Sequence, residues 1–249
     1  MSRLDDIEFF DRLYRIFKNT IDMLVDRGSD KSYLTKHYIN KNKTLEQFMK
    51  NYENTSIVII DNDRSDIKHI VYIDADNMTT NKKDIQKILQ SINRIINETV
   101  IDGEVNVILV LNKVLSSDRI SESELRKQKI HADRYKSENR KIISILDQMV
   151  DTSISSVEVF FFDDCIINPN KHVFIGEGAY RKLSEKEKDD LLKSGMYKPH
   201  QIPPIDVNEP LIRWHGGQDG DIFKIMSYND GINGGLYSIQ YRLVKQDLL

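Results

Sequence analysis

The sequence contains one cysteine, Cys165, among its 249 residues. A disulfide within the chain is therefore impossible, and a zinc site built from several cysteine thiolates is excluded. The chain also lacks a run of about 18 apolar residues, which a membrane-spanning helix needs. Its first residues carry acidic side chains where a signal peptide would have a basic segment. These absences lead us to expect a soluble intracellular protein without a membrane contact.

An excess of positive charge is missing as well. The chain has 36 Lys and Arg against 39 Asp and Glu, a net charge of −3, which argues against a protein that coats DNA by bulk charge. Its six histidines lie far apart, with no pair at i,i+4 spacing. Neither the phosphate-binding G-x-x-x-x-G-K-[ST] motif nor the nucleophile motif G-x-S-x-G occurs. The sequence therefore predicts no catalytic residues, no metal site and no cofactor.

The first 150 residues have the pattern of an α/β domain that begins with helices. Apolar residues recur at helical spacing up to Leu24, and Gly28 provides a left-handed helix stop. Further along, two strand-like runs flank a helical stretch within about forty residues, which is the pattern of a βαβ unit. The predicted helices cover 7–24, 44–52 and 80–99, and the predicted strands cover 56–61, 69–74 and 104–112.

A charged segment at 116–141 interrupts this pattern. Between Asp118 and Lys141, eight basic residues stand against five acidic ones, a local charge of +3. Such a segment is either a solvated helix or excursion, or a small patch that faces nucleic acid or a protein partner. The basic residues of the possible patch are Arg126, Lys127, Lys129, Arg134, Lys136, Arg140 and Lys141.

The motifs in the second half of the chain predict helix ends, turns and strands, and none of them is a catalytic motif. We expect a domain boundary at 151–156, and Ser184 with Glu187 at capping-box spacing predicts a helix. Residues 202–205, Ile-Pro-Pro-Ile, form an extended strap, because each proline restricts the residue before it. Pro210 then begins a short helix that Gly216-Gly217 ends. The strand-like runs 221–227 and 236–244 predict a β-hairpin, with Tyr237, Ile239, Tyr241 and Leu243 on its apolar face.

A series of short motifs follows in order through this half. They are Asn168-Pro169-x-x-His172-Val173, Gln201-Ile202-Pro203-x-Ile205, Glu209-Pro210, Arg213-Trp214, Gly220, Lys224-Ile225, Ser227, Gly235-x-Tyr237 and Tyr241-Arg242-Leu243-Val244. This order resembles the C-terminal assembly domain of the fifth common subunit of eukaryotic DNA-dependent RNA polymerases, and its archaeal counterpart. The opening helix, with its Asp26-Arg27-Gly28 ending, is similar to the start of the eukaryotic jaw domain.

The chain also departs from this family at three positions. A proline stands at Pro204 and a leucine at Leu236, where the family usually has arginine, and Trp214 replaces a tyrosine. The missing arginines remove any contact that those side chains make in relatives. The composition, rich in Asn, Ile and Lys, suggests the further hypothesis of a copy encoded by a large DNA virus.

The resemblance implies an α/β jaw domain over 1–150, made of helices and a small mixed sheet, and a compact α+β assembly domain over 157–249 that ends in a β-hairpin. It implies a non-catalytic polymerase subunit that docks on the largest subunit, contacts other subunits, and lies near downstream duplex DNA, with transcription factors as further partners. Its location would be the nucleus if the source is cellular, or a cytoplasmic viral factory or the virion if it is viral. The expected contacts to the largest subunit are Gln201, Ile202, Pro203, Ile205, Pro210, Arg213, Trp214, Tyr237, Tyr241 and Arg242.

Two other functions stay open at this stage. Asp74 and Asp76 follow a predicted strand, and hard carboxylate oxygens there suit a divalent metal, as in PIN-like nucleases. A nuclease needs more acids at the same metal, however, and Asp pairs are common in turns. The other alternative is a stand-alone adaptor that has the assembly domain but does not join a polymerase.

Overall fold

The computed structural model describes residues 3–52, 56–61, 67–75, 82–99, 104–112, 154–172, 175, 178–194, 197–229 and 236–246. Contacts divide the chain into two compact units. Unit 1 comprises residues 1–24 and 29–167, and unit 2 comprises residues 25–28 and 168–249. The division at 167/168 lies later than the boundary expected at 151–156, because the strand at Ile154–Phe161 pairs with a strand of unit 1.

Unit 1 begins with the predicted long helix, α1 (Arg3–Asp26). Its apolar stripe is buried from Leu13 onward, whereas Ile7, expected in the same stripe, remains 46% exposed. Gly28 adopts φ +105°, the left-handed conformation that ends helices at glycine, as the sequence predicted. The next helix, α2 (Lys31–Leu34), and the π-helix Thr35–Ile39 that continues it were not predicted. Asp30 caps α2 by accepting a hydrogen bond from the Ser32 amide.

The short helix α3 (Leu45–Asn51) confirms the prediction for 44–52 and packs on α1 through aromatic side chains. Thr44 caps it by accepting a hydrogen bond from the Gln47 amide. The Phe48 ring lies 5.0 Å from that of Tyr14 and 5.2 Å from that of Phe17, and the Tyr14 hydroxyl donates to the backbone after the π-helix. Aromatic pairs at such distances stabilise a core beyond the area that they bury.

The sheet of unit 1 has the order β1-β2-β3-β4 and is mixed. Strand β1 pairs antiparallel with β2, whereas β2, β3 and β4 run parallel. Helix α4 (Lys82–Thr99) connects β2 to β3, so the predicted βαβ unit is confirmed. The strands are β1 (Ser56–Asp61), β2 (Ile67–Asp74), β3 (Glu104–Leu111) and β4 (Ile154–Phe161), and the short helix α6 (Phe162–Cys165) follows β4.

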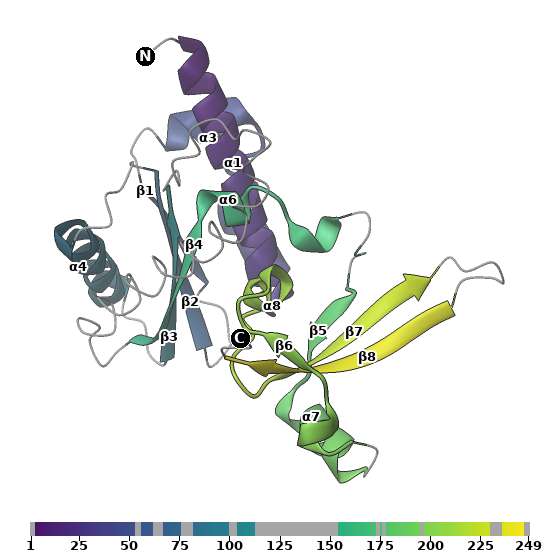
Figure 1. The fold of residues 1–249 in the computed structure, drawn as a ribbon. Coiled ribbons are helices and arrows are strands. Elements are labelled where there is room, and N and C mark those ends of the chain that lie inside the picture. The colour runs from purple at the N-terminus through teal and green to yellow at the C-terminus, as the bar shows by residue number, and fades with distance from the viewer. Residues whose placement is uncertain are drawn as a thin grey trace, which may run out of the picture. The chain divides into compact units, whose positions relative to one another are not determined.

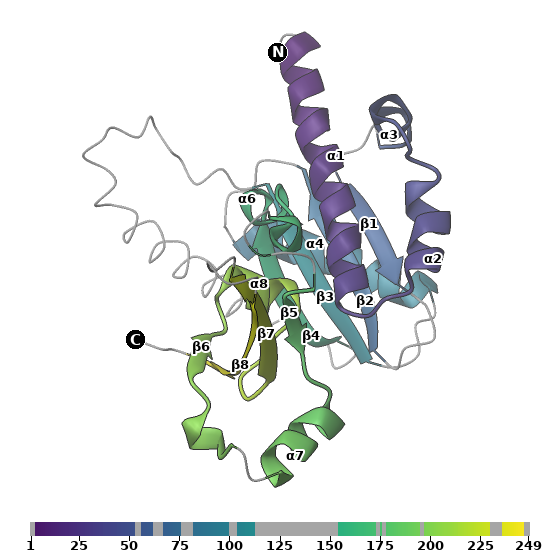
Figure 2. The ribbon, with the colours of Figure 1, turned by 90° about the vertical axis from the view of Figure 1, so that its right-hand side faces the viewer.

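Both faces of this sheet are covered, as parallel sheets require. Helix α4 lies on one face and α1 on the other (Figures 1 and 2). Ile88, Leu89 and Ile92 of α4 pack on side chains such as Val107 and Leu109 of β3 in one buried cluster. The unit is thus an α/β layer structure with a mixed sheet, as the sequence predicted.

Unit 2 is an α+β structure around a sheet of order β5-β7-β8-β6. Strands β7 and β8 form the predicted antiparallel hairpin. Strand β5 pairs antiparallel with β7, and β6, which contains the end of the strap, pairs parallel with β8. The strands are β5 (Tyr180–Lys182), β6 (Pro204–Asp206), β7 (Ile222–Asn229) and β8 (Leu236–Lys245).

Two helices cover this sheet, one for each of its small clusters. Helix α7 (Glu185–Lys193) brings Leu191 and Leu192 against Leu183, Ile202 and Ile222. Helix α8 (Pro210–Trp214) places Ile212 against Phe223 and Val244. Both helices begin where the sequence predicted. On the apolar face expected for β8, Tyr241 and Leu243 are half-buried, as predicted. Ile239, on the same face, is 53% exposed.

No helix in the described ranges is long and apolar enough to cross a membrane.

Candidate functional site

The short helix α8 is held at both ends. Pro210 occupies its first position, where the missing amide is not needed. After its last residues the chain turns through Gly216, whose φ is +64°. The Arg27 guanidinium completes this end, because its Nε donates to the Trp214 carbonyl at 2.9 Å and its Nη2 donates to the Arg213 carbonyl at 2.7 Å. A cation at the carboxyl end of a helix satisfies free carbonyls and complements the helix dipole.

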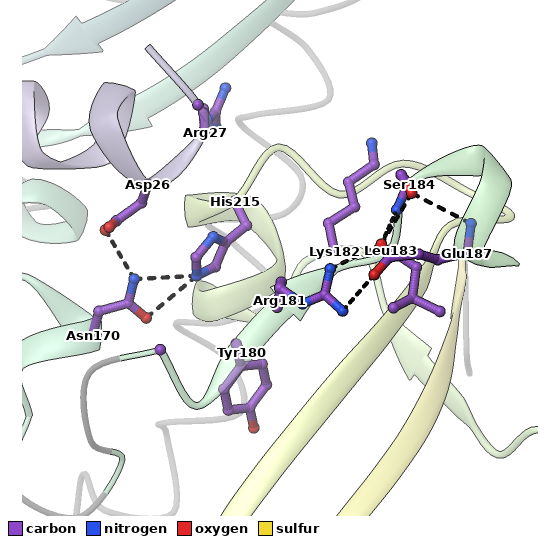
Figure 3. Close-up of a pocket in the computed structure, with 12 residues that line it drawn as sticks. Asp26, Arg27, Asn170, Tyr180, Arg181, Lys182, Leu183, Ser184, Glu187 and His215 are labelled. Carbon is purple, nitrogen blue, oxygen red and sulfur yellow. Dashed lines mark hydrogen bonds and ion pairs between the residues drawn. The ribbon is translucent and has the colours of Figure 1, made fainter. Parts of the chain in front are cut away.

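A second anchor is the Asp26 carboxylate, the residue next to Arg27. Its Oδ2 accepts hydrogen bonds from Trp214 Nε1 at 2.7 Å and from Asn170 Nδ2 at 2.8 Å. Asn170 is only 4% exposed and also lies 3.1 Å from His215 Nε2 (Figure 3). Hydrogen bonds to a charged acceptor are the stronger kind, so this buried network ties three separate chain segments together.

Burial lowers the pKa of His215 below its usual value, while the nearby Asp26 carboxylate opposes that shift and Arg27 adds to it. The neutral imidazole is therefore favoured in the folded protein. A neutral ring can both donate and accept, which suits its place beside the Asn170 amide.

These residues line one side of a half-open pocket of about 520 Å³ within unit 2. On the other side, Arg181 reaches Glu187 with two hydrogen bonds of 2.8 Å, as Figure 3 shows. Lys182 forms an ion pair of 2.7 Å with Asp221. The twelve lining residues are Asp26, Arg27, Gly28, Asn170, Gly178, Tyr180, Arg181, Lys182, Leu183, Ser184, Glu187 and His215.

Glu187 has two roles at this side of the pocket. It pairs with Arg181, and it accepts hydrogen bonds from the Ser184 amide and hydroxyl at the start of α7. The Arg181 guanidinium first, and the Ser184 bonds next, lower the pKa of Glu187 to about 2. The capping box predicted from the sequence is therefore present, with an arginine added to it from β5.

Of the charged groups around the pocket, Arg181 and Glu187 pair with each other, whereas Asp26 and Arg27 bond to neutral groups. Within the described ranges, no group of three or more His, Cys, Asp or Glu side chains could hold a metal ion. The arrangement orients the helices and strands around the pocket through ion pairs and hydrogen bonds.

Comparison with known proteins assigns the C-terminal part of the chain to a family. Residues 167–244 match the family described as RNA polymerase Rpb5, C-terminal domain. The chain is 34% identical over 76 residues to DNA-directed RNA polymerase subunit Rpo5 of Thermococcus kodakarensis, which covers 30% of this chain and 87% of that protein. The chain belongs to the Rpb5/Rpo5 family of RNA polymerase subunits.

Other RNA polymerase subunits are also similar to part of the chain. The identity to DNA-directed RNA polymerases IV and V subunit 5B of Arabidopsis thaliana is 31% over 88 residues, 35% of this chain and 38% of that protein. The match therefore spans less than two fifths of the plant subunit. Subunit Rpo5 of Thermococcus onnurineus is 34% identical over 68 residues, 27% of this chain and 79% of that protein.

The interface residues expected from the Rpb5/Rpo5 resemblance fall into groups. Gln201, Pro203 and Pro210 are exposed, whereas Ile205, Arg213, Tyr241 and Arg242 are half-buried. The side chain of Tyr237 lies outside the described residues, and its backbone belongs to β8.

Two of the expected contact residues are buried within unit 2. Ile202 is 3% exposed and lies in the cluster under α7, and Trp214 is 1% exposed and bonds to Asp26. Both side chains stabilise the module itself and offer a partner almost no surface. The reason is that the strap and α8 turn their apolar residues towards the sheet, which the local sequence does not reveal.

The basic patch Arg126–Lys141 lies outside the described residues. Asp74 ends β2 and is buried, but Asp76 also lies outside them. The Asp74 carbonyl accepts the Asn112 amide at 3.0 Å, and Asn112 Nδ2 donates to the Ala75 carbonyl at 2.7 Å, so this turn has a structural explanation. No observation favours the nuclease.

Sequence reasoning missed the roles of Asp26, Arg27 and Asn170. Asp26 and Arg27 were interpreted only as the end of a helix, although their motif resembles one in the family. A buried Asn after Asn168-Pro169 was a weaker signal, because polar residues near proline are common in turns. The Asp26–Asn170, Arg27–Arg213 and Asp26–Trp214 hydrogen bonds join residues that lie 144 to 188 positions apart in the chain.

Proposed function

We propose that this chain is a non-catalytic subunit of a multisubunit DNA-directed RNA polymerase. The observation that carries the proposal is the match over residues 167–244 to a polymerase-subunit domain. A separate match of 76 residues covers 87% of an archaeal Rpo5 protein. That archaeal protein is little longer than the matched segment, so a module of this size is sufficient to be a polymerase subunit.

Unit 2 acts as the assembly domain and docks on the largest subunit. Its shape supports this role, because α8 is held at both ends and the strap is paired into the sheet through β6. A docking surface held rigidly in advance loses little entropy on binding. The contacts come from the exposed and half-buried residues Gln201, Pro203, Ile205, Pro210, Arg213, Tyr241 and Arg242.

Unit 1 acts as the jaw domain and lies near downstream duplex DNA in the assembled enzyme. The similarity of its opening helix to the jaw of eukaryotic relatives supports this assignment. The basic patch Arg126–Lys141 would contact phosphates, which position a duplex without reading its sequence. The protein would act in the nucleus of a cellular source, or in the viral factory or virion if a large DNA virus encodes it.

Co-purification with the polymerase tests this proposal. The full-length chain, tagged and expressed with the largest polymerase subunit, should be retained with it at equal stoichiometry. Arg242→Glu should weaken retention, because it reverses a half-buried charge on β8. Arg94→Glu is the matched control on α4, where Arg94 is exposed and forms an ion pair with Glu98. Absence of the wild-type chain from the polymerase fraction would contradict the proposal.

A further inference from the structure

The open edge of β8 is a feature that the family assignment does not explain. Strand β8 covers Leu236–Lys245, and β6 pairs only with Leu243, Val244 and Lys245. Before Leu243, none of the described strands pairs with β8 on the side away from β7. Figure 1 shows the outer parts of β7 and β8 extending beyond β5 and β6.

The strap explains why the pairing stops. Leu243 donates its amide to the Pro203 carbonyl at 3.1 Å, but Pro203 and Pro204 have no amide of their own to donate. Just before them, Pro199–Gln201 forms a 3-10 helix, and Ile202 is buried. The strap therefore leaves the sheet and cannot cover the rest of β8.

The backbone groups on this edge can be assigned from the hydrogen bonds around it. Val244 donates to the Asp221 carbonyl on the β7 side, whereas Leu243 donates towards β6. Successive residues of a strand point their amides and carbonyls to opposite sides. The backbone amides and carbonyls of Ile239 and Tyr241 therefore point to the same side as those of Leu243. Strand β6 does not extend along β8 to these two residues.

On one face of the sheet, the side chains near this edge are apolar. Met226 and Ile239 are opposite each other in the hairpin and are 38% and 53% exposed. The Tyr241 ring lies on the same face, 5.6 Å from the exposed ring of Tyr197. Natural edge strands are normally guarded by a charge, a proline or a bulge, and Ile239 and Tyr241 supply none of these.

The charged side chains of the two hairpin strands are all basic. Strands β7 and β8 contain Lys224, Arg242 and Lys245 and no acidic residue. An extended segment beside them would therefore be favoured by an acidic side chain of its own.

We propose that the Ile239–Tyr241 edge of β8 accepts an extended segment of the largest polymerase subunit as an added strand. The segment alternates apolar side chains, which cover Met226 and Ile239, with residues that include an acidic one facing Arg242. Strand addition draws its affinity from main-chain hydrogen bonds and its specificity from alternate side chains. The identity of the partner rests on the proposed function, whereas the mode of binding rests on the edge.

The first test measures amide hydrogen exchange in the full-length chain, alone and bound to the largest subunit. The amides of Ile239 and Tyr241 should exchange fast in the free chain and become protected in the complex. The amides of Gln240 and Arg242, which point to β7, should change much less. Equal protection of all four, or of none, would overturn strand addition.

The second test uses substitutions of adjacent exposed residues. Ile239→Pro removes one edge amide at a position where a proline does not disturb the β7 ladder, and it should weaken binding about tenfold or more. Ile239→Lys should weaken binding similarly, whereas Gln240→Lys, the same charge on the other face, should bind almost as the wild type does. The fluorescence of Trp214 verifies that unit 2 remains folded.

The outcomes separate the two proposals. If the wild type binds the largest subunit and the Ile239 variants bind equally well, the strand-addition proposal is wrong while the proposed function stands. If the wild-type chain binds no polymerase subunit, the proposed function fails, and the partner named here fails with it.

Discussion

Trp214 Nε1 donates a hydrogen bond to Asp26 Oδ2 at 2.7 Å, although 188 residues separate the two in the chain. The same carboxylate oxygen accepts the Asn170 side chain. A residue at the end of the first helix is therefore part of the module that contains the C-terminal hairpin. Because Trp214 is the only tryptophan and is buried in unit 2, its fluorescence reports the unfolding of that unit.

Asp26→Ala should destabilise unit 2 strongly. The substitution removes two hydrogen bonds to a charged acceptor and leaves the Trp214 and Asn170 donors without it, so we expect a loss of roughly 2–4 kcal/mol in the free energy of unfolding. Urea denaturation followed by Trp214 fluorescence measures this loss. Asp189→Ala is the control, since Asp189 forms an exposed pair with Lys193, and it should cost about 0.5 kcal/mol or less. Equal midpoints for the two variants would contradict this account.

Gly217→Ala should also destabilise unit 2, through overpacking. A methyl group at this position would lie 2.5 Å from Ile212 Cγ2 and 2.9 Å from Phe223 Cε2, both in the buried cluster under α8. Such insertions into a packed core typically cost about 1–3 kcal/mol. Thermal denaturation should show a lower Tm for this variant, whereas Gln218→Ala, which changes an exposed neighbour, should leave Tm nearly unchanged. A wild-type Tm for Gly217→Ala would show that the cluster has room to adjust.

Unit 2 should lose stability as the pH falls below about 6.5, the ordinary pKa of histidine. Burial lowers the pKa of His215 in the folded state, so the unfolded chain takes up a proton first. The stability contributed by the neutral ring is present above about pH 6.5 and is lost as the pH falls through the lower folded value.

Denaturation of unit 2 between pH 8 and pH 5 measures this dependence. His215→Gln should flatten it, because the titrating ring is gone. His200→Gln should leave it intact, because His200 is exposed. A slope that survives in the His215 variant would assign the dependence to another group.

Arg181 should control the ionisation of Glu187. The Arg181 guanidinium is the main cause of a Glu187 pKa of about 2, so Arg181→Ala should move that pKa up towards the ordinary value of 4.5. A carbon-detected NMR titration of the Glu187 carboxyl measures the shift. In the wild type, the stabilisation from this carboxylate is present above about pH 4.5 and is lost as the pH falls towards about 2. Lys182→Ala, which removes a neighbouring cation paired with Asp221, should leave the Glu187 titration unchanged.

Charge reversal in the basic patch should change the salt dependence of transcription. If Lys127 and Lys136 contact phosphates, replacing both by Glu should reduce the slope of log K against log salt by about 0.9 for each phosphate that is no longer neutralised. Binding of downstream duplex by the assembled polymerase, measured at several salt concentrations, gives this slope, and the start-site sequence should stay the same. Arg94→Glu, a single charge reversal on α4 outside the patch, is the control and should leave the slope unchanged. An unaltered slope would remove the patch from the path of the DNA.

Several features of this protein follow from short stretches of sequence. Gly28 ends α1, Ser184 and Glu187 cap α7, and Pro210 begins α8, all where the pattern predicted. The βαβ unit and the β7–β8 hairpin were also predicted correctly. These features depend on the conformational preferences of a few neighbouring residues and on periodicity, and both can be read locally.

The tertiary structure alone decided which side chains meet and which remain exposed. The sequence does not indicate that Asp26 and Arg27 belong to the unit of Trp214, that the strap pairs parallel with β8, or that Ile202 is buried while Ile239 is exposed. Each of these depends on contacts between distant segments, whose formation balances chain entropy against burial over the whole fold. Local preferences determined the helices and strands of this protein, and long-range packing determined its anchor residues and its open edge.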